Sequence, residues 1–339
     1  NSKIYYAESM DTVPDNLSDV SPTVAVCVPR FFEKMYNGVI RKVKAGSSLK
    51  QNLFWWAISI GKDCVALLHS NKKLPIILKL KHFIANRLVY TKIREKIGGN
   101  IKFFISGGAP LSVDVAEFFA SLNITILEGY GLTETSPVLT SNTPDGIKFG
   151  YVGKPLNNVE LKIAGDGEIL ARGPNVMLGY YNNKEATSEV IDSEGWFSTG
   201  DIGLIDDEGY LKITDRKKSL IVTSGGKNIA PAPLENALLT SSYIDQVLVV
   251  GDKRNFLSCL IVPSFDNVKD FLKASGKDLD STEAIIDYPD VLDLFDSELD
   301  KAMSNFSKYE QIKKFSLLSR AFMIEKGELT PKMSIVRKV

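Results

Sequence analysis

Residues 128–135 (EGYGLTET) place an aromatic ring, a hydroxyl and a carboxylate on one glycine-containing turn that follows an apolar strand. The glycines allow backbone conformations and close approaches that a Cβ atom would forbid. Tyr130 offers a flat face for a base, Thr133 a hydroxyl for a phosphate oxygen, and Glu134 an oxygen ligand for Mg²⁺. The run predicts a nucleotide site, although by itself it is equally compatible with a simple turn carrying a surface glutamate.

A second glycine turn precedes this one. Residues 101–105 (IKFFI) predict a buried strand, and residues 106–110 (SGGAP) predict a tight turn before a helix. A further strand is expected at 124–127, leading into the first motif. Loops that leave neighbouring parallel strands meet at the carboxyl edge of one sheet, where open α/β folds bind their ligands.

Composition excludes several classes of protein. The 41 basic and 41 acidic residues are interspersed and leave a net charge of zero, which disfavours a nucleic-acid reader. Cys27, Cys64 and Cys259 are far apart among apolar neighbours, as expected of reduced core residues in a cytoplasmic protein. His69 and His82 fall in a predicted helical stretch, so neither a histidine metal site nor a Ser/His/Asp triad is expected.

One apolar stretch is relevant to membranes. Residues 53–61 (LFWWAISIG) are about half the roughly 20 residues that a spanning helix requires. The paired Trp55 and Trp56 leave peripheral membrane contact open, while packing of this helix on the core is the default expectation.

The pattern of elements predicts three parts. Residues 1–147 are expected to form an α/β subdomain with a long helical insertion at about 48–97, residues 148–214 a small β-barrel-like subdomain, and residues 215–339 a mobile α+β domain. The expected elements include strands at 3–7, 23–29, 159–163, 167–171, 210–213, 246–250 and 257–262, a turn at 14–16, and a helix near 232–240.

Three further groups of polar or glycine residues lie beyond residue 197. Asp201, in a glycine turn, suits vicinal ribose hydroxyls, although a turn aspartate bonded to nearby amides is the more common case. Asp215 and Arg216 lie in a charge cluster at a domain junction, which predicts a hinge whose arginine could reach a ribose or phosphate. Gly225 and Gly226 predict a hairpin that either lines a narrow channel or only turns the chain.

These pieces, in this order, resemble the AMP-forming adenylating superfamily and, within it, the long-chain fatty acid–CoA ligases. The matching blocks span most of residues 101–235 in the family's order and spacing. They are SGGAPL at 106–111, EGYGLTET at 128–135, GE at 167–168, RGP at 172–174, GYY at 179–181, STGD at 198–201, DR at 215–216 with Lys218, and GG at 225–226.

The resemblance implies roles for individual residues. Gly107, Gly108, Ala109 and Pro110 would border the adenine, and Glu128, Gly129, Tyr130 and Gly131 would form the nucleotide-binding turn, with Tyr130 stacked on the base. Thr133 would hold the α-phosphate, Glu134 the Mg²⁺, Asp201 the ribose hydroxyls with help from Arg216, and Asp215 the hinge, while Gly225 and Gly226 would line the CoA channel. ATP, a fatty acid and CoA are the implied ligands, giving an acyl-adenylate, then acyl-CoA and AMP.

Two departures from the family pattern stand out. The family's phosphate-binding loop, which ends in Pro-Lys-Gly, is not among these residues, so the resemblance implies the carboxyl-terminal part of a longer enzyme, with adenylation by this part alone impaired. Aligned through residues 329–331 (LTP), the family's adenylation lysine falls on Ser334. Lys332, two residues earlier, is the candidate substitute, and a solvated tail lysine is the alternative.

The departures leave two other functions open. One is a ligase of the same fold that hands the acyl group to a carrier protein instead of CoA. The other is a catalytically idle module that binds a nucleotide or an acyl-adenylate, which the missing phosphate loop and Ser334 would explain.

Overall fold

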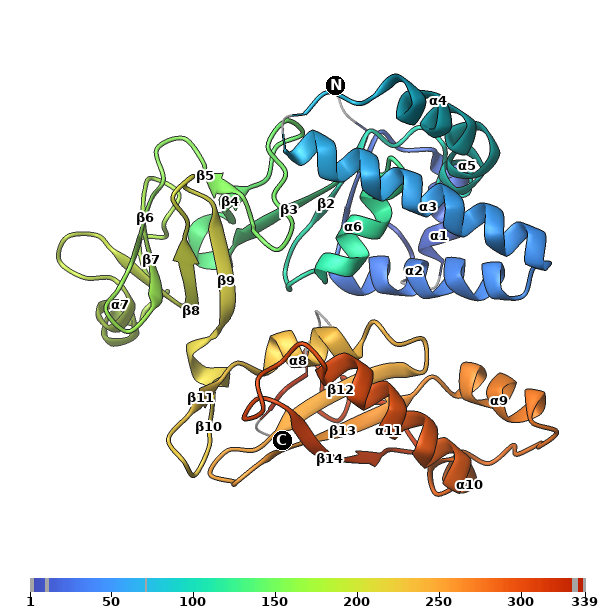
Figure 1. Cartoon of the computed structure of the whole chain (residues 1–339). Coiled ribbons are helices and arrows are strands. Elements are labelled where there is room, and N and C mark those ends of the chain that lie inside the picture. The colour runs from blue at the N-terminus through green and yellow to red at the C-terminus, as the bar shows by residue number, and fades with distance from the viewer. Residues whose placement is uncertain (1–2, 10–11, 71, 331–334, 338–339) are drawn as a thin grey trace. The chain divides into compact units, whose positions relative to one another are not determined.

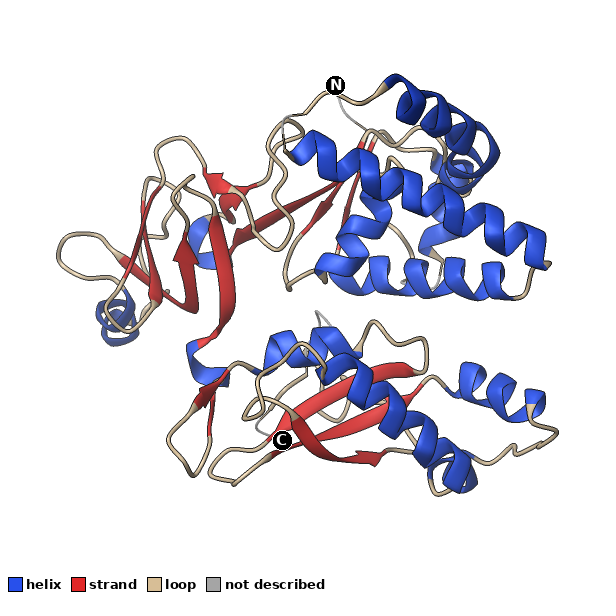
Figure 2. Ribbon diagram, viewed as in Figure 1, coloured by secondary structure: helices blue, strands red, loops and turns tan. Residues whose placement is uncertain are grey.

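The computed structural model describes residues 3–9, 12–70, 72–330 and 335–337, and its chain divides into two compact units. Unit 1 comprises Asn1–Leu161, Ala171–Phe197 and Ile205–Lys212, and unit 2 comprises Lys162–Leu170, Ser198–Leu204 and Ile213–Val339. Figure 2 shows helices and strands in both units, as the α/β fold class predicted. No helix in the described ranges has the length and apolar character needed to cross a membrane.

Unit 1 contains a five-stranded sheet in the order β1-β2-β3-β4-β5. Strands β1 (Val24–Cys27), β2 (Phe103–Ser106) and β3 (Ile126–Gly131) pair in parallel, whereas β4 (Val138–Ser141) and β5 (Lys154–Pro155) pair antiparallel. Parallel neighbours need crossover connections, which the helices between these strands supply. The two parallel strands expected at 101–105 and 124–127 are confirmed as β2 and β3.

The helical insertion is also present. The helices of unit 1 in the first half of the chain are α1 (Val13–Val20), α2 (Pro29–Lys44), α3 (Ser48–His69), α4 (Ile76–Ala85), the π-helical turn η1 (Asn86–Tyr90), α5 (Thr91–Glu95) and α6 (Val113–Ser121). Helix α6 contacts β3, and α3 packs against α6 (Figure 1).

Two expectations near the amino terminus are wrong. Residues 3–7 are exposed and form no strand, because no described segment pairs with them. The turn expected at 14–16 lies inside α1, where Pro14 occupies the first turn of the helix. Proline is tolerated there because the first N–H groups of a helix have no intrahelical acceptor.

Aromatic side chains join the helices of unit 1 to its sheet. Phe32 on α2 meets Phe104 on β2 edge to face at 5.5 Å between ring centroids, and it meets Phe119 on α6 at 5.9 Å. Each of the three rings is fully buried. Such edge-to-face contacts stabilise a pair beyond the burial of its surface.

Helices α3 and α6 approach each other at a glycine. A Cβ atom added at Gly61 would lie 2.0 Å from the carbonyl oxygen of Ser121, so only glycine allows this distance between the helices. The same helix buries Phe54 and Ala57 and leaves Trp55 45% exposed. The residue 53–61 stretch therefore packs on the core.

A four-stranded sheet follows, in the order β6-β7-β8-β9. Its strands are β6 (Glu160–Ile163), β7 (Glu168–Arg172), β8 (Phe197–Ile205) and β9 (Leu211–Arg216), with α7 (Lys184–Val190) between β7 and β8. The short strands predicted at 159–163, 167–171 and 210–213 are thus confirmed. Gly167 and Gly209 have positive φ angles and close the turns that the pattern required.

Unit 2 has a three-stranded sheet in the order β12-β13-β14 and two helices, α8 and α11, that pack together. From residue 221 onward, the helices and strands of unit 2 are β10 (Ile221–Val222), β11 (Asn228–Ile229), α8 (Pro231–Leu238), β12 (Ile244–Val250), β13 (Leu257–Pro263), α9 (Phe265–Ala274), α10 (Thr282–Ile286), α11 (Pro289–Met303) and β14 (Ile312–Leu317). Strand β14 was not predicted. Only Ile312 and Leu317, at its two ends, are buried, so its sequence lacks the apolar alternation of a strand.

The approach of α3 to α6 can be tested by adding one methyl group. Gly61→Ala should lower the free energy of unfolding of unit 1 by roughly 1–3 kcal/mol, because the helices must separate to accommodate the Cβ atom. Gly38→Ala is the matched control, since a Cβ atom there has nothing within 4 Å and lies in the middle of α2. Urea unfolding followed by circular dichroism measures both, and equal stability of the two variants would contradict the packing described here.

Candidate active site

The loop after β2 is open to solvent. Gly108, Ala109 and Pro110 are exposed, and a Cβ atom at Gly108 would have nothing within 4 Å. Gly108 has a φ of +86°, a conformation that favours glycine. At the start of the loop the Gly107 N–H donates to the carbonyl oxygen of Cys27 at 3.4 Å. The loop therefore combines a fixed start with an exposed backbone that a flat ligand can approach.

Glu128 fixes the far end of this loop. Parallel pairing sets Glu128 on β3 beside Ser106 on β2, and the buried carboxylate accepts a hydrogen bond from the Leu111 N–H. Burial raises the pKa of Glu128 to about 7, and the Leu111 hydrogen bond opposes that rise. The hydroxyl of Ser106 is buried and has no hydrogen-bond partner among the described residues.

The turn after β3 depends on a close backbone approach. A Cβ atom at Gly131 would lie 1.7 Å from the carbonyl oxygen of Pro137, and one at Gly129 would lie 3.3 Å from that of Thr140. Neither glycine has a positive φ angle, so space is the reason for glycine here. The Tyr130 side chain is buried, with 8% of its surface exposed, so its stacking on a base stays a prediction.

Thr133 and Glu134 form a 3₁₀ turn, η2 (Thr133–Thr135), directly after this strand. Thr133 is exposed, and Glu134 accepts a hydrogen bond at Oε1 from the Tyr180 hydroxyl at 3.0 Å. The other carboxylate oxygen, Oε2, makes no hydrogen bond to a described residue. A carboxylate with one hydrogen-bonded oxygen and one oxygen available for coordination can serve as the protein ligand of a Mg²⁺ ion. Substrate phosphates and water supply the other ligands of such a site.

Residues around Met177 donate hydrogen bonds to this turn, which the sequence did not predict. Besides the Tyr180 contact, the Met177 N–H donates to the Glu134 carbonyl oxygen at 2.8 Å, and the Asn175 side-chain amide donates to that of Thr135 at 2.9 Å. The residues 172–181 carried a family resemblance, but their partners lie some forty positions earlier in the chain. No local pattern reveals such contacts.

Asp201 belongs to a hydrogen-bonded group in unit 2. Its side chain is 7% exposed and pairs with Arg216, with 3.3 Å between Oδ1 and Nε. The turn before it is held by Glu168, which accepts the Gly200 N–H at 2.8 Å and pairs with Lys217 at 2.8 Å. Asp201 and Arg216, which the resemblance assigned to one ribose, therefore form an ion pair, and the arginine side chain is 71% exposed. Their contact with a ribose stays a prediction.

Asp215 directly precedes this arginine. Its Oδ1 accepts the Arg216 N–H, while its buried Oδ2 has no hydrogen-bond partner in the part of the chain that the structure describes. Burial raises the pKa of this carboxyl. A buried oxygen without a partner is uncommon in native proteins, and here it marks the position predicted as the hinge.

Gly225 and Gly226 form the tip of the hairpin between β10 and β11, as predicted. Gly226 has a φ of +72°, and a Cβ atom there would have nothing within 4 Å. The hairpin loop is bonded to the next loop just before the glycines, since the Ser224 N–H donates to the Arg254 carbonyl oxygen at 3.0 Å. The loop is thus held at Ser224 and open at Gly226.

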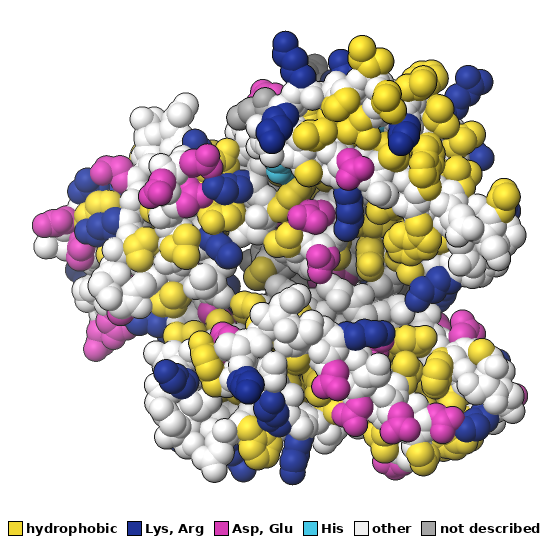
Figure 3. All heavy atoms as spheres, viewed as in Figure 1, with side chains coloured by type: hydrophobic (Ala, Val, Ile, Leu, Met, Phe, Trp, Pro, Cys, Tyr) yellow, Lys and Arg dark blue, Asp and Glu magenta, His cyan; other side chains and the backbone are white. Residues whose placement is uncertain are grey.

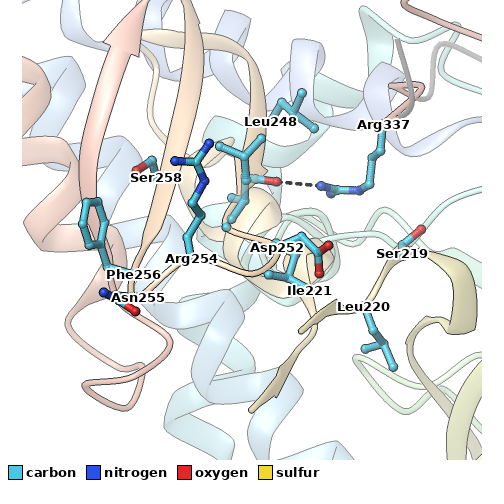
Figure 4. Close-up of a pocket in the computed structure, with 13 residues that line it drawn as sticks. Ser219, Leu220, Ile221, Leu248, Asp252, Arg254, Asn255, Phe256, Ser258 and Arg337 are labelled. Carbon is cyan, nitrogen blue, oxygen red and sulfur yellow. Dashed lines mark hydrogen bonds between the residues drawn. The ribbon is translucent and has the colours of Figure 1, made fainter. Parts of the chain in front are cut away.

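A cavity of about 700 Å³ lies beside this hairpin in unit 2 (Figure 4). Leu220, Val249, Arg254 and Phe256 are among its lining residues, and no predicted site residue lines it. Arg337 closes one side by donating to the Val249 carbonyl oxygen at 2.7 Å. Because the predicted chemistry lies elsewhere, size alone does not make this cavity the site.

The two tail residues of the prediction, Lys332 and Ser334, lie outside the described residues. The tail is anchored after them by Arg337, which pairs with Glu235 at 2.5 Å. Among the residues that the structure describes, no three His, Cys, Asp or Glu side chains form a cluster that could hold a metal ion.

Comparison with known proteins assigns the family. Residues 3–181 match the AMP-binding enzyme family, and residues 218–339 match the AMP-binding enzyme C-terminal domain. The chain belongs to the AMP-binding enzyme family. The glycine loop and the EGYGLTET turn of this AMP-binding enzyme fall in the first match, and the hairpin that carries Gly225 and Gly226 falls in the second.

Curated relatives cover nearly all of this AMP-binding enzyme chain. It is 39% identical over 324 residues to a long-chain-fatty-acid–CoA ligase of Mycobacterium bovis, covering 95% of this chain and 53% of the relative. It is 33% identical over 351 residues to the peroxisomal long chain acyl-CoA synthetase 6 of Arabidopsis thaliana, covering 98% of this chain and 48% of the relative. The chain thus spans about half the length of these relatives.

Solved structures share the fold. The adenylation domain of a carboxylate reductase from Mycobacterium chelonae superposes with a TM-score of 0.71 at 21% identity, covering 98% of this chain and 46% of that one. O-succinylbenzoate Coenzyme A synthetase from Bacillus subtilis, in complex with AMP, superposes with a TM-score of 0.59 at 22% identity, covering 97% of this chain and 53% of that one.

The environment of Glu128 predicts a pH dependence of stability. Burial raises its pKa in the folded state from the ordinary value of 4.5 to about 7, so the folded state binds more protons than the unfolded state between these two pH values. The protonated Glu128 therefore contributes to the free energy of unfolding below pH 4.5. This contribution is lost as the pH rises through 7, which lowers the free energy of unfolding by roughly 3 kcal/mol. Glu128→Gln should remove this part of the slope when urea unfolding is measured from pH 5 to pH 8, and identical slopes in both proteins would contradict the assignment.

Proposed function

We propose that the chain is the carboxyl-terminal part of a long-chain fatty acid–CoA ligase of the AMP-forming kind. The observation that carries the proposal is the parallel register of Ser106 with Glu128, because it sets two ligand-binding loops at one sheet edge. Relatives up to 39% identical over 95% of the chain are named for this activity. In the reaction a fatty carboxylate attacks the α-phosphorus of ATP and pyrophosphate leaves; a CoA thiol then attacks the acyl carbonyl and AMP leaves.

In this proposal unit 1 supplies the phosphate and metal ligands. The exposed Thr133 hydroxyl donates to an α-phosphate oxygen, and the open Oε2 of Glu134 binds Mg²⁺ with the Tyr180 hydroxyl holding Oε1 in place. A bound Mg²⁺ supplies charge neutralisation at the phosphates. Residues 107–110 border the adenine. Phosphoryl chemistry of this kind requires positioning and electrostatic stabilisation more than a protein nucleophile.

In the same proposal, unit 2 supplies the ribose contacts and the rotation about Asp215 that separates the two half-reactions. Asp201 accepts hydrogen bonds from the ribose hydroxyls, and the exposed Arg216 head group lies beside it at 3.3 Å. Asp215 is the hinge, and its unpartnered Oδ2 is the atom whose surroundings a rotation would change. The open tip at Gly225 and Gly226 admits the narrow pantetheine arm of CoA.

The acyl acceptor is the part of the proposal for which a second candidate has support. An A-PCP didomain of a carboxylic acid reductase from Segniliparus rugosus has this fold, with a TM-score of 0.68 at 23% identity. The same adenylation chemistry can therefore precede transfer to a carrier domain instead of free CoA. Comparing turnover with CoA and with a carrier protein separates the two acceptors.

The adenylation half-reaction is tested with the full-length protein that contains these residues. We expect ATP–pyrophosphate exchange that depends on a long-chain fatty acid and on Mg²⁺, followed by acyl-CoA formation when CoA is added. Exchange without any acyl-CoA would favour the carrier-protein acceptor. Absence of exchange across fatty acids of all lengths would support an idle binding module and overturn the ligase proposal.

The ribose contact is tested by binding. Asp201→Ala should weaken AMP or acyl-adenylate-analogue binding roughly 10- to 100-fold, because hydrogen bonds to a charged acceptor contribute about 1.5–3 kcal/mol. Asp207→Ala is the matched control, since this exposed carboxylate lies six positions further along the chain. Isothermal titration calorimetry measures both, with circular dichroism to verify folding, and equal affinities of the two variants would refute the assignment.

A further inference from the structure

Helix α4 and the π-helical turn η1 present an apolar face to solvent. Six large hydrophobic side chains between 41% and 85% exposed make up this face, and they are Ile76, Ile77, Leu80, Phe83, Ile84 and Leu88. We call this set the α4 face. Its members recur at helical spacing, so they lie along one side of the helix. Figure 3 shows hydrophobic side chains gathered over this part of the molecule, with Lys and Arg side chains around them.

The opposite side of the same segment already packs on the core. Ala85 and Tyr90 are fully buried, and the Tyr90 hydroxyl donates to the Ala57 carbonyl oxygen at 2.6 Å. His82 lies within hydrogen-bond distance of Asn123 at 3.3 Å. The helix therefore has one apolar side used for folding and a second that folding leaves uncovered. Contiguous exposed apolar surface of this kind marks an interaction site.

The charged side chains of the segment that carries the α4 face have one sign. Residues 72–94 contain seven Lys and Arg residues and no Asp or Glu, although the whole chain has equal numbers of both signs. The exposed cations are Lys72, Lys73, Lys79, Lys81, Arg87 and Lys92. None of these six forms a salt bridge with another residue in the described ranges. Consecutive helical residues are about 100° apart, so Lys79 and Lys81 flank Leu80 on both sides.

We propose that the α4 face binds the surface of a bilayer that contains anionic lipids. The apolar side chains would enter the boundary between head groups and acyl chains, while the flanking cations contact lipid phosphates. Charge complementarity selects this partner: a protein partner covering six apolar side chains would not require a border of cations alone, whereas an anionic bilayer matches both features. The proposal concerns binding and does not depend on the ligase activity.

This surface is separate from the stretch that the sequence first suggested for membrane contact. Phe54 and Ala57 of the Trp55–Trp56 stretch are buried, with Phe54 against Phe118 of α6, and Trp55 contacts Phe54 edge to face. The α4 face carries the exposed apolar area instead. A bilayer surface is also where a long-chain carboxylate concentrates, because each buried methylene favours partitioning.

The test is co-sedimentation of the chain with lipid vesicles. We expect binding to vesicles of phosphatidylcholine mixed with phosphatidylglycerol, weaker binding to vesicles of phosphatidylcholine alone, and loss of the difference at high salt. Leu80→Gln with Phe83→Gln should weaken binding by more than roughly tenfold, because both side chains leave the lipid. Lys79→Gln with Lys81→Gln should weaken binding to the anionic vesicles by about 30-fold, or roughly fivefold per lysine.

Matched controls come from the same unit. Leu49→Gln removes a side chain that is 77% exposed at the start of α3, and Lys42→Gln with Lys44→Gln removes two exposed charges from α2. Both controls should bind vesicles as the unaltered chain does. Circular dichroism of every variant verifies folding, which exposed positions should preserve.

Three results would overturn the proposal. They are absence of vesicle binding, equal binding to both kinds of vesicle, and α4 variants that bind as well as the controls. Analytical ultracentrifugation without lipid adds a fourth: a dimer that Leu80→Gln with Phe83→Gln abolishes would assign the α4 face to a second copy of the chain.

Discussion

The parallel pairing of β2 with β3 is the constraint on which the candidate site of unit 1 depends. It sets Ser106 beside Glu128, so the loop after one strand and the turn after the other leave the sheet at the same edge. A slip of one residue would turn the Glu128 side chain to the opposite face of the sheet. The hydrogen bond from Leu111 to this carboxylate would then be lost, and with it the brace on the loop that begins at Gly107.

Four poorly exposed carboxylates hold functional segments in a similar way. Glu128 accepts the N–H of Leu111, Glu168 that of Gly200, Asp215 that of Arg216, and Glu235 that of Val249. A buried carboxylate is costly unless it is hydrogen-bonded or paired, so each contact ties a backbone segment to one geometry. The segments held in this way are the glycine loop, the turn before Asp201, the backbone at Arg216 and the strand beside Arg337.

The cysteine thiols of the chain are poorly suited to act as nucleophiles. Burial raises the pKa of Cys27 to about 11 and that of Cys259 to about 12, so neither thiol is a ready nucleophile at neutral pH. These cysteines are the reduced, apolar-environment residues that composition predicted. The proposed reaction joins a substrate carboxylate to a substrate phosphate, and the protein's part is to position both and to neutralise charge.

The sequence by itself determined the class of fold, the glycine loops and most elements, because these depend on local periodicity and on glycine and proline at fixed positions. The family resemblance assigned Asp201 and Arg216 to one ribose, and the ion pair between them is a finding of the structure. Strand β14 and helix α1 escaped prediction, since β14 has no apolar alternation and Pro14 serves as a helix start. Only the tertiary structure revealed the hydrogen bond from Tyr180 to Glu134, the close approach of the Pro137 carbonyl to Gly131 and the exposure of the α4 face. Those features join residues far apart in the chain or depend on what packing leaves uncovered, and no local pattern of residue types contains that information.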